Sequence, residues 1–295
     1  MRHEPRGRTL HITSGDCAGA RLDASSVDGD VFVWHDILYD GPRAPGWPDD
    51  EALAARARFL SRATGGGLAE PYVLRTLRDQ YRRLAALPGG RPVVLWFDAC
   101  LFDQAMLAHI LACLALRGRD EAELLVVDAF DGVEPYHGLG QLTPAQLASV
   151  YPDRAFVTPA QWRFARTVDR AFALQDAGLL ADLARTQAAP LPWAPAAAAR
   201  WLQERPDPRT GLGRLETLAL TAVRAGCERL GDICQAVDAA ETPPRFWGDT
   251  TLWAKINALA DRDPPLVRIR GPADRLPQWQ GQADPERFHV TACGA

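Results

Sequence analysis

Four short apolar runs, with segments of helical period between them, constrain the fold of this chain more than any other feature. The runs are TLHIT (9–13), VFVW (31–34), PVVLWF (92–97) and ELLVV (123–127). They are nearly continuous in Val, Ile, Leu and aromatic residues, which is typical of strands covered on both faces in a parallel sheet. We therefore expect an α/β fold built on a mostly parallel, doubly wound sheet.

The intervening segments predict three helices. In 49–63, Leu53, Ala57 and Leu60 share one face, and the arginines are expected elsewhere. The segment 73–87 repeats this pattern, whereas 102–118 is apolar nearly all round and predicts a buried helix with a core histidine, His109. The tetrapeptide TPAQ occurs at 143–146 and 158–161, and each copy predicts a helix start with Thr as the N-cap and Gln closing a capping box.

The composition changes near residue 188 and suggests two units. Residues 1–187 form the expected Rossmann-like α/β domain, and the Pro- and Ala-rich stretch AAPLPWAPAAAAR (188–200) is interpreted as a linker. In 201–295, the segments 214–226, 230–237 and 248–260 predict three helices, and PPLVRIRGPADRL predicts a strand and a turn. Three helices with a hairpin-like wing suggest a smaller winged-helix-like domain.

Charge argues against nucleic acid as a partner. The net charge is -4, from 33 basic and 37 acidic residues, whereas phosphate contacts usually need a cationic surface. The third helix of the C-terminal region carries Lys255 but has Asp249, Asp261 and Asp263 at its ends. We therefore expect this region to contact the first domain or a protein partner, and DNA binding is the lesser alternative.

The chain is expected to be cytoplasmic, without a membrane partner. No apolar run approaches the roughly 18 residues of a membrane span, and the first residues lack the apolar core of a secretory signal. The six cysteines form no CxxC pair, which favours reduced thiols over disulfides or zinc.

An aspartate follows every predicted strand of the sheet. The strand ends HITSGD, VFVWHD, VVLWFD and LLVVD finish at Asp16, Asp36, Asp98 and Asp128. Carboxyl ends of parallel strands lie along one edge, where ligands bind, and gathered carboxylates would need protons or a shared cation. Asp16, Asp36 and Asp98 are therefore predicted ligands of Mg²⁺, which prefers oxygen. The alternative is that each aspartate caps the helix that follows its strand.

Further residues near these strand ends are candidates for binding or catalysis. The turn SGDCAG (14–19) could hold an anion on backbone N–H groups, although a turn that needs small residues explains it too. The predicted ligand-binding residues are Ser14, Gly15, Asp16, Cys17, Asp36, Asp40, Gly41, Asp98 and Gln104. Asp103 and His137 are candidates for proton transfer. The alternatives are a surface histidine at 137 and a small buried residue at Cys17.

Several of these motifs resemble a known family. LHITSGDCAG, VFVWHDILYDGP, VVLWFDACLFDQAMLAHIL and GLGQLTPAQL resemble the bacterial family called domain of unknown function 1835. GLGRLETLAL and FWGDTTLWAKINALA resemble the module called domain of unknown function 3658. The resemblance implies a bacterial intracellular protein and supplies no reaction. The family often has serine where Cys17 stands. The resemblance implies that the following residues belong to recurring motifs: Gly15, Asp16, Asp36, Gly41, Pro42, Asp98, Asp103 and Gln104.

Three functions are compatible with these patterns. The first is a Mg²⁺-assisted hydrolase or transferase that acts on a phosphorylated or nucleotide ligand at the carboxyl edge of the sheet. The second is a non-catalytic module that binds a small molecule or nucleotide and relays its presence to a protein partner through the C-terminal domain. The third is a DNA-binding regulator, which the charge balance disfavours.

Overall fold

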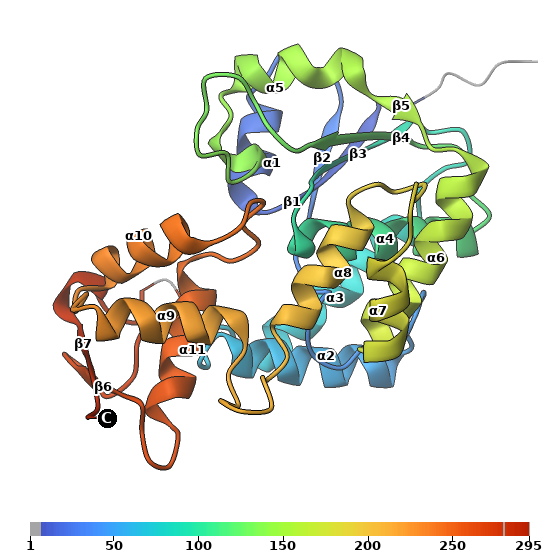
Figure 1. The fold of residues 1–295 in the computed structure, drawn as a ribbon. Helices are drawn as coiled ribbons and strands as arrows, with labels where there is room; N and C mark the ends of the chain where they lie inside the picture. Colours follow the sequence, from blue (N-terminus) through green and yellow to red (C-terminus); the bar gives the residue numbers. More distant parts are fainter. Residues whose placement is uncertain (1–6, 280, 295) are drawn as a thin grey trace, which may run out of the picture.

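A five-stranded sheet forms the centre of the computed structural model, which describes residues 7–279 and 281–294 (Figure 1). The strand order is β2-β1-β3-β4-β5. The first four strands are parallel: β1 (Leu10–Ser14), β2 (Asp30–Trp34), β3 (Val93–Asp98) and β4 (Glu123–Val127). The short β5 (Ala155–Phe156) pairs antiparallel with β4. The predicted α/β fold with a mostly parallel sheet is confirmed.

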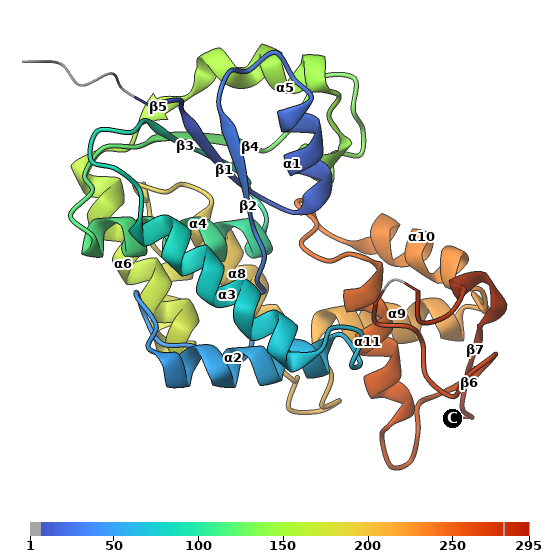
Figure 2. The ribbon, with the colours of Figure 1, turned by 180° about the vertical axis from the view of Figure 1, so that it is seen from behind.

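Helices cover both faces of this sheet, as Figures 1 and 2 show. On one face lie α1 (Asp16–Asp23) and α5 (Pro144–Val150). On the other lie α2 (Asp50–Ala63), α3 (Glu70–Ala85), α4 (Leu101–Leu116), α6 (Pro159–Leu174), α7 (Ala177–Ala184) and α8 (Ala194–Gln203). Successive side chains of β3 point to opposite faces of the sheet and belong to two hydrophobic clusters. Val94 and Trp96 pack with α1 and α5, whereas Leu95 and Phe97 pack on the α4 side.

The predicted local signals for helices are borne out. Both TPAQ sequences form complete capping boxes, with Thr143 at the start of α5 and Thr158 at the start of α6. Helix α4 is buried over most of its length, and His109 on it is only 1% exposed. Its imidazole hydrogen-bonds to the Tyr81 hydroxyl (2.6 Å) and the Asp169 carboxylate (2.9 Å), so this histidine belongs to the core.

The stretch 188–200, interpreted from its composition as a linker, is instead largely packed structure. Helix α8 begins within it, and Ala194, Ala197 and Ala198 are buried against neighbouring helices that include α4 and α7. Pro195 stands in the first turn of α8, where a missing N–H costs nothing. Alanine side chains are small enough to let two helices approach closely. The Ala-rich composition that suggested a linker therefore allows tight helix packing here.

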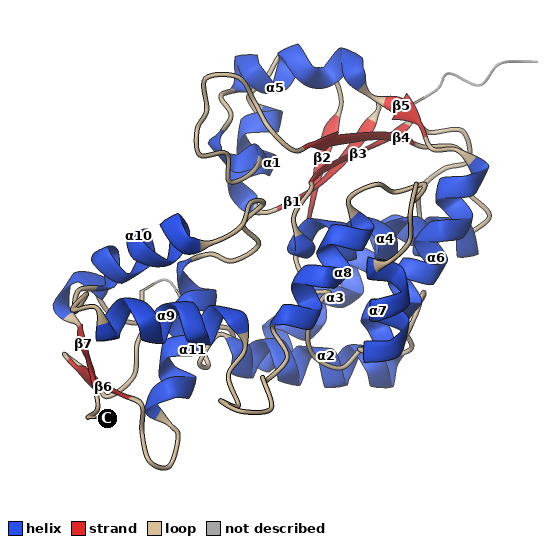
Figure 3. Cartoon of the chain, viewed as in Figure 1, coloured by secondary structure: helices blue, strands red, loops and turns tan. Residues whose placement is uncertain are grey.

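The C-terminal module follows α8 and combines α-helices with a small sheet (Figure 3). Its helices are α9 (Arg214–Arg224), α10 (Leu230–Ala240) and α11 (Asp249–Ala260), and β6 (Val267–Arg270) pairs antiparallel with β7 (His289–Ala292). The arrangement matches the predicted elements, and the finer winged-helix interpretation stays a prediction. None of the helices in the described part of the chain combines the length and the apolar character that crossing a bilayer requires.

Candidate functional site

The ends of β1 and β3 carry a hydrogen-bonded network of predicted site residues. The strand order makes the β1/β3 gap the topological switch point of the sheet, where ligands bind in open α/β folds. The Ser14 hydroxyl donates to Asp103 Oδ1 (2.6 Å), and the Asp98 backbone N–H donates to Asp103 Oδ2 (2.6 Å). Gln104 Nε2 donates to the Asp98 carbonyl (2.8 Å). The structure therefore brings together four residues that the sequence suggested.

The segment between β4 and α5 covers the Asp98 carboxylate. We call residues 128–139 the covering loop. Within it, the Tyr136 hydroxyl donates to Asp98 Oδ1 (2.6 Å), and Leu139 N–H donates to both carboxylate oxygens at 3.1 and 3.0 Å. Gly138 permits this approach, because its φ is 136° and a Cβ there would lie 2.5 Å from Asp98 Oδ2. The covering loop thus lies over the Asp98 carboxyl group and hydrogen-bonds to it.

Burial raises the pKa values of both the Asp98 and the Asp103 carboxyl groups. Burial, and next the charge of Asp103, raise the pKa of Asp98 well above its usual value. Burial also raises the pKa of Asp103 to about 6, although hydrogen bonds from Ser14 and Asp98 oppose this. The two groups have the chemical character of a shared acid–base pair near neutral pH.

Asp16 and Asp36 lie in different environments from Asp98. Asp16 Oδ1 is 2.7 Å from His35 Nε2, and this pair is open to solvent, with 84% and 48% of the two side chains exposed. Asp36 Oδ1 instead accepts from Arg56 Nε (2.8 Å), and both side chains are at most 3% exposed. The same guanidinium donates to the carbonyls of Ile37 and Asp40, so it fixes the turn after β2.

The three predicted metal ligands do not fit a common Mg²⁺ site. Asp36 is neutralised by Arg56, Asp98 is bonded to Tyr136 and the covering loop, and Asp16 faces His35. Across residues 7–279 and 281–294, no group of three His, Cys, Asp or Glu side chains is placed to hold a metal ion. The alternative of independent helix caps also differs from the structure, because Gly15 and Cys100 occupy the N-cap positions of α1 and α4.

His137 and Cys17 differ from what the sequence suggested. His137 Nε2 lies 3.2 Å from Asp238 Oδ2 on α10, so it joins the covering loop to the C-terminal module. Burial, and next the charge of Arg245, lower the pKa of His137. Cys17 is exposed at the start of α1, so the alternative of a small buried residue is wrong there, although the next two residues of the helix, Ala18 and Gly19, are buried.

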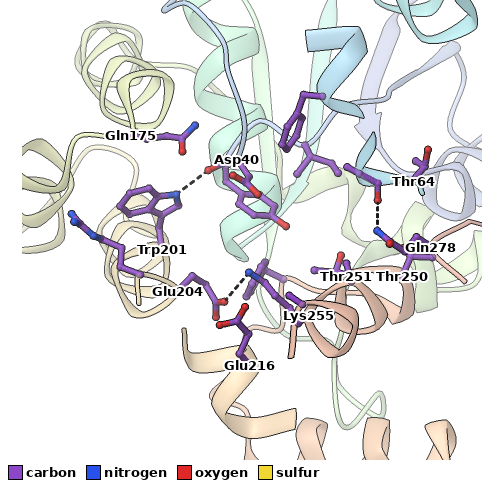
Figure 4. Close-up of a pocket in the computed structure, with 18 of the residues that line it drawn as sticks. Asp40, Thr64, Gln175, Trp201, Glu204, Glu216, Thr250, Thr251, Lys255 and Gln278 are labelled. Carbon is purple, nitrogen blue, oxygen red and sulfur yellow. Dashed lines mark hydrogen bonds and ion pairs between the residues drawn. The ribbon is translucent and has the colours of Figure 1, made fainter. Parts of the chain in front are cut away.

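A pocket of about 430 Å³ lies between the turn after β2 and the C-terminal module (Figure 4). We call it the junction pocket. Helices α2, α8, α9 and α11 contribute to its walls. Its aromatic residues are Tyr39, Phe59, Trp201, Phe246 and Trp279, and its charged residues are Asp40, Glu204, Arg205, Glu216 and Lys255. Of the residues predicted to bind a ligand, Asp40 lines this pocket and Gly41 adjoins it.

Two side chains hold the turn after β2 against the pocket. Trp201 Nε1 donates to the Tyr39 carbonyl (2.9 Å), and Gln175 Nε2 donates to the Gly41 carbonyl (2.6 Å). Gly41 has φ 77°, a conformation that L residues rarely adopt. The turn thereby places Asp40 in the wall of the junction pocket.

Glu204 is a largely buried carboxylate of the pocket, with 13% of its side chain exposed. Its Oε1 accepts from Arg200 Nη1 (2.5 Å) and from Leu215 N–H (3.1 Å). Its Oε2 is buried without a hydrogen-bond partner among the described residues. Lys255 Nζ lies 3.9 Å from Oε2, which is an ion pair but too long for a hydrogen bond (Figure 4).

Several residues of these sites were missed in the sequence. Tyr136, Trp201 and Glu204 lie outside the strand ends on which the predictions rested, and only the fold brings them near. Lys255 carried a signal, because it is the only lysine in the chain, yet its pocket is formed by segments far apart in sequence.

Comparisons with known proteins do not assign the chain to a family. No protein-family model matches the chain, and no curated protein matches it. The resemblance to domains of unknown function 1835 and 3658 stays a prediction.

Proposed function

We propose that this protein binds a small organic molecule in the junction pocket, and that the bound molecule connects the α/β unit to the C-terminal module. The pocket itself carries the proposal. Its volume of about 430 Å³ falls within the range of small-molecule sites, and such sites favour domain junctions with aromatic walls and a few polar groups. Both parts of the chain supply its walls, so a ligand would contact both.

The polar face of α11 supports binding of this kind over binding to DNA. Thr250, Thr251 and Lys255 would be the exposed contacts of a recognition helix, yet they line the junction pocket. A helix that reads a groove must present such side chains outward. A protein partner of the C-terminal module would therefore use another of its surfaces.

The test is a fragment screen read by thermal unfolding and by labelling of Lys255. An amine-reactive reagent has two targets in the chain, Lys255 and the terminal amino group, which peptide mass mapping separates. We expect bound fragments to raise the unfolding midpoint and to slow labelling of Lys255. Ala254→Phe, which fills the pocket, should abolish both effects, whereas Ala239→Phe on the exposed side of α10 should keep them. Fragments that bind both variants equally and leave Lys255 labelling unchanged would contradict the proposal.

A second candidate function is metal-free acid–base catalysis at the β1/β3 switch point. The observation that favours it is the Asp98–Asp103 pair, whose raised pKa values suit proton transfer near neutral pH. The covering loop would have to open to admit a substrate. Esters, phosphoesters and nucleotides form the test panel. Loss of turnover in Asp103→Asn, with turnover kept in Asp131→Asn, would support this function. Unchanged turnover in both variants would contradict it.

A further inference from the structure

We infer that the ligand of the junction pocket is an organic amine, positively charged at neutral pH, with an apolar body. This inference rests on the proposed function and specifies its ligand class. The free polar groups of the pocket and the composition of its walls both point to it.

Carboxylates outnumber cationic side chains in the pocket, since Asp40, Glu204 and Glu216 face only Arg205 and Lys255. Glu204 Oε2 is buried and has no hydrogen-bond partner among the described residues, with only the Lys255 ammonium near it at 3.9 Å, so it can accept a hydrogen bond from a ligand. Glu216 and Asp40 add two more carboxylates, each of which uses one oxygen to accept from a nearby backbone N–H. A ligand ammonium group has three donors and no acceptor, which complements this excess.

An anion fits the same pocket poorly. Lys255 and Arg205 are its cations, and Lys255 already faces Glu204 at 3.9 Å. A carboxylate or phosphate that approached Lys255 would therefore lie next to Glu204, where like charges repel.

The apolar walls provide the site for the rest of the ligand. Phe59 comes from α2, Trp201 from α8, and Phe246 from the segment before α11. Aromatic faces attract cations as well as apolar groups, so they would stabilise both parts of an aryl-alkyl amine. Trp279 also lines the pocket and is 39% exposed, so this aromatic side chain is within reach of a molecule that enters from solvent.

The experiment is calorimetric titration of the full chain with three probes of similar shape: phenethylamine, 2-phenylethanol and 3-phenylpropionate. We expect the amine to bind at least about tenfold more tightly than the other two, which corresponds to one hydrogen bond to a charged group. An alcohol or a carboxylate that binds as tightly as the amine would overturn the inference.

Matched variants locate the amine. Glu204→Gln replaces the unpaired oxygen with a donor and should weaken phenethylamine binding about tenfold or more. Asp40→Asn, at an exposed position, should also weaken it, and this variant does not disturb a buried ion pair. Glu121→Gln, far along the surface, should have no effect. Unchanged affinity in both Glu204→Gln and Asp40→Asn would refute the amine site.

Failure of this inference differs from failure of the proposed function. Neutral or anionic fragments that shield Lys255, while phenethylamine does not bind, would refute the amine and leave the pocket as a binding site. A screen in which nothing shields Lys255 would refute both.

Discussion

Arg56 is a buried arginine whose charge is matched by a single buried carboxylate. Its side chain and that of Asp36 are at most 3% exposed, and the guanidinium also organises the turn after β2. Removing one partner of a buried ion pair leaves an uncompensated charge, so Arg56→Met should cost about 3–5 kcal/mol of unfolding free energy. Arg58→Met on the exposed side of the same helix should change it by less than about 0.5 kcal/mol. Urea denaturation of both variants measures this difference, and equal midpoints would contradict it.

The position of Arg56 could have been predicted from the sequence. Residue 56 follows Leu53 by three and precedes Leu60 by four, so helical spacing places it on the buried face. The expectation that the arginines of this helix lie elsewhere is wrong at this residue, because the buried Asp36 carboxylate compensates the charge of Arg56. Its partner Asp36 lies on another element, and that pairing depends on the tertiary fold.

A second residue-scale prediction concerns Asp103 and pH. The pKa of its carboxyl is about 6 in the folded chain and near the ordinary value of 3.8 when unfolded. The folded state therefore binds the proton more tightly, and this contribution to stability is present below pH 3.8 and lost as pH rises through 6. The loss should amount to about 3 kcal/mol. Asp103→Asn should remove this part of the pH dependence, whereas Asp131→Asn in the covering loop should leave it. Parallel wild-type and Asp103→Asn profiles between pH 4 and 7 would contradict the pKa assignment.

At the scale of elements, the covering loop depends on Gly138. An alanine at 138 would adopt an unfavourable φ and place its Cβ against Asp98 Oδ2. Gly138→Ala should therefore cost at least about 2 kcal/mol and speed hydrogen exchange of the Leu139 amide. Gly132→Ala is the matched control, because Gly132 also has positive φ but open space for a Cβ. It should cost only about 1–2 kcal/mol and leave the exchange of Leu139 unchanged. Equal effects of the two variants on Leu139 would show that contact with Asp98 does not hold the loop.

Elements with strong local signals were predictable, and those defined by tertiary contacts were not. The four parallel strands and both capping boxes follow from apolar runs and short polar motifs. Strand β5 has two exposed residues and exists through pairing with β4, so no local pattern indicates it. The predicted aspartates lie just after the carboxyl ends of their strands, but their partners Arg56, His35 and Tyr136 come from other segments, and no local pattern indicates these pairings.

At the scale of the whole molecule, the α/β unit and the C-terminal module share one core. A single cluster of buried residues extends from β3 through α8 to α9 and α11. Across the same junction, Arg200 of α8 forms a buried ion pair with Glu241, which also accepts from Trp247 Nε1 (3.0 Å). A boundary set by composition near residue 188 therefore falls inside a continuous packed region.

This shared core predicts that the chain unfolds in one cooperative step. Calorimetry should give a single transition with equal calorimetric and van't Hoff enthalpies. Arg200→Met would leave Glu241 buried with only part of its compensation, so it should lower the midpoint of that one transition. Arg209→Met, at an exposed position in the connection to α9, should leave the midpoint within about 1 °C, since surface changes cost little. Two resolved transitions, of which Arg200→Met shifts one alone, would mean that the α/β unit and the module are independently stable and that the junction pocket joins separate domains.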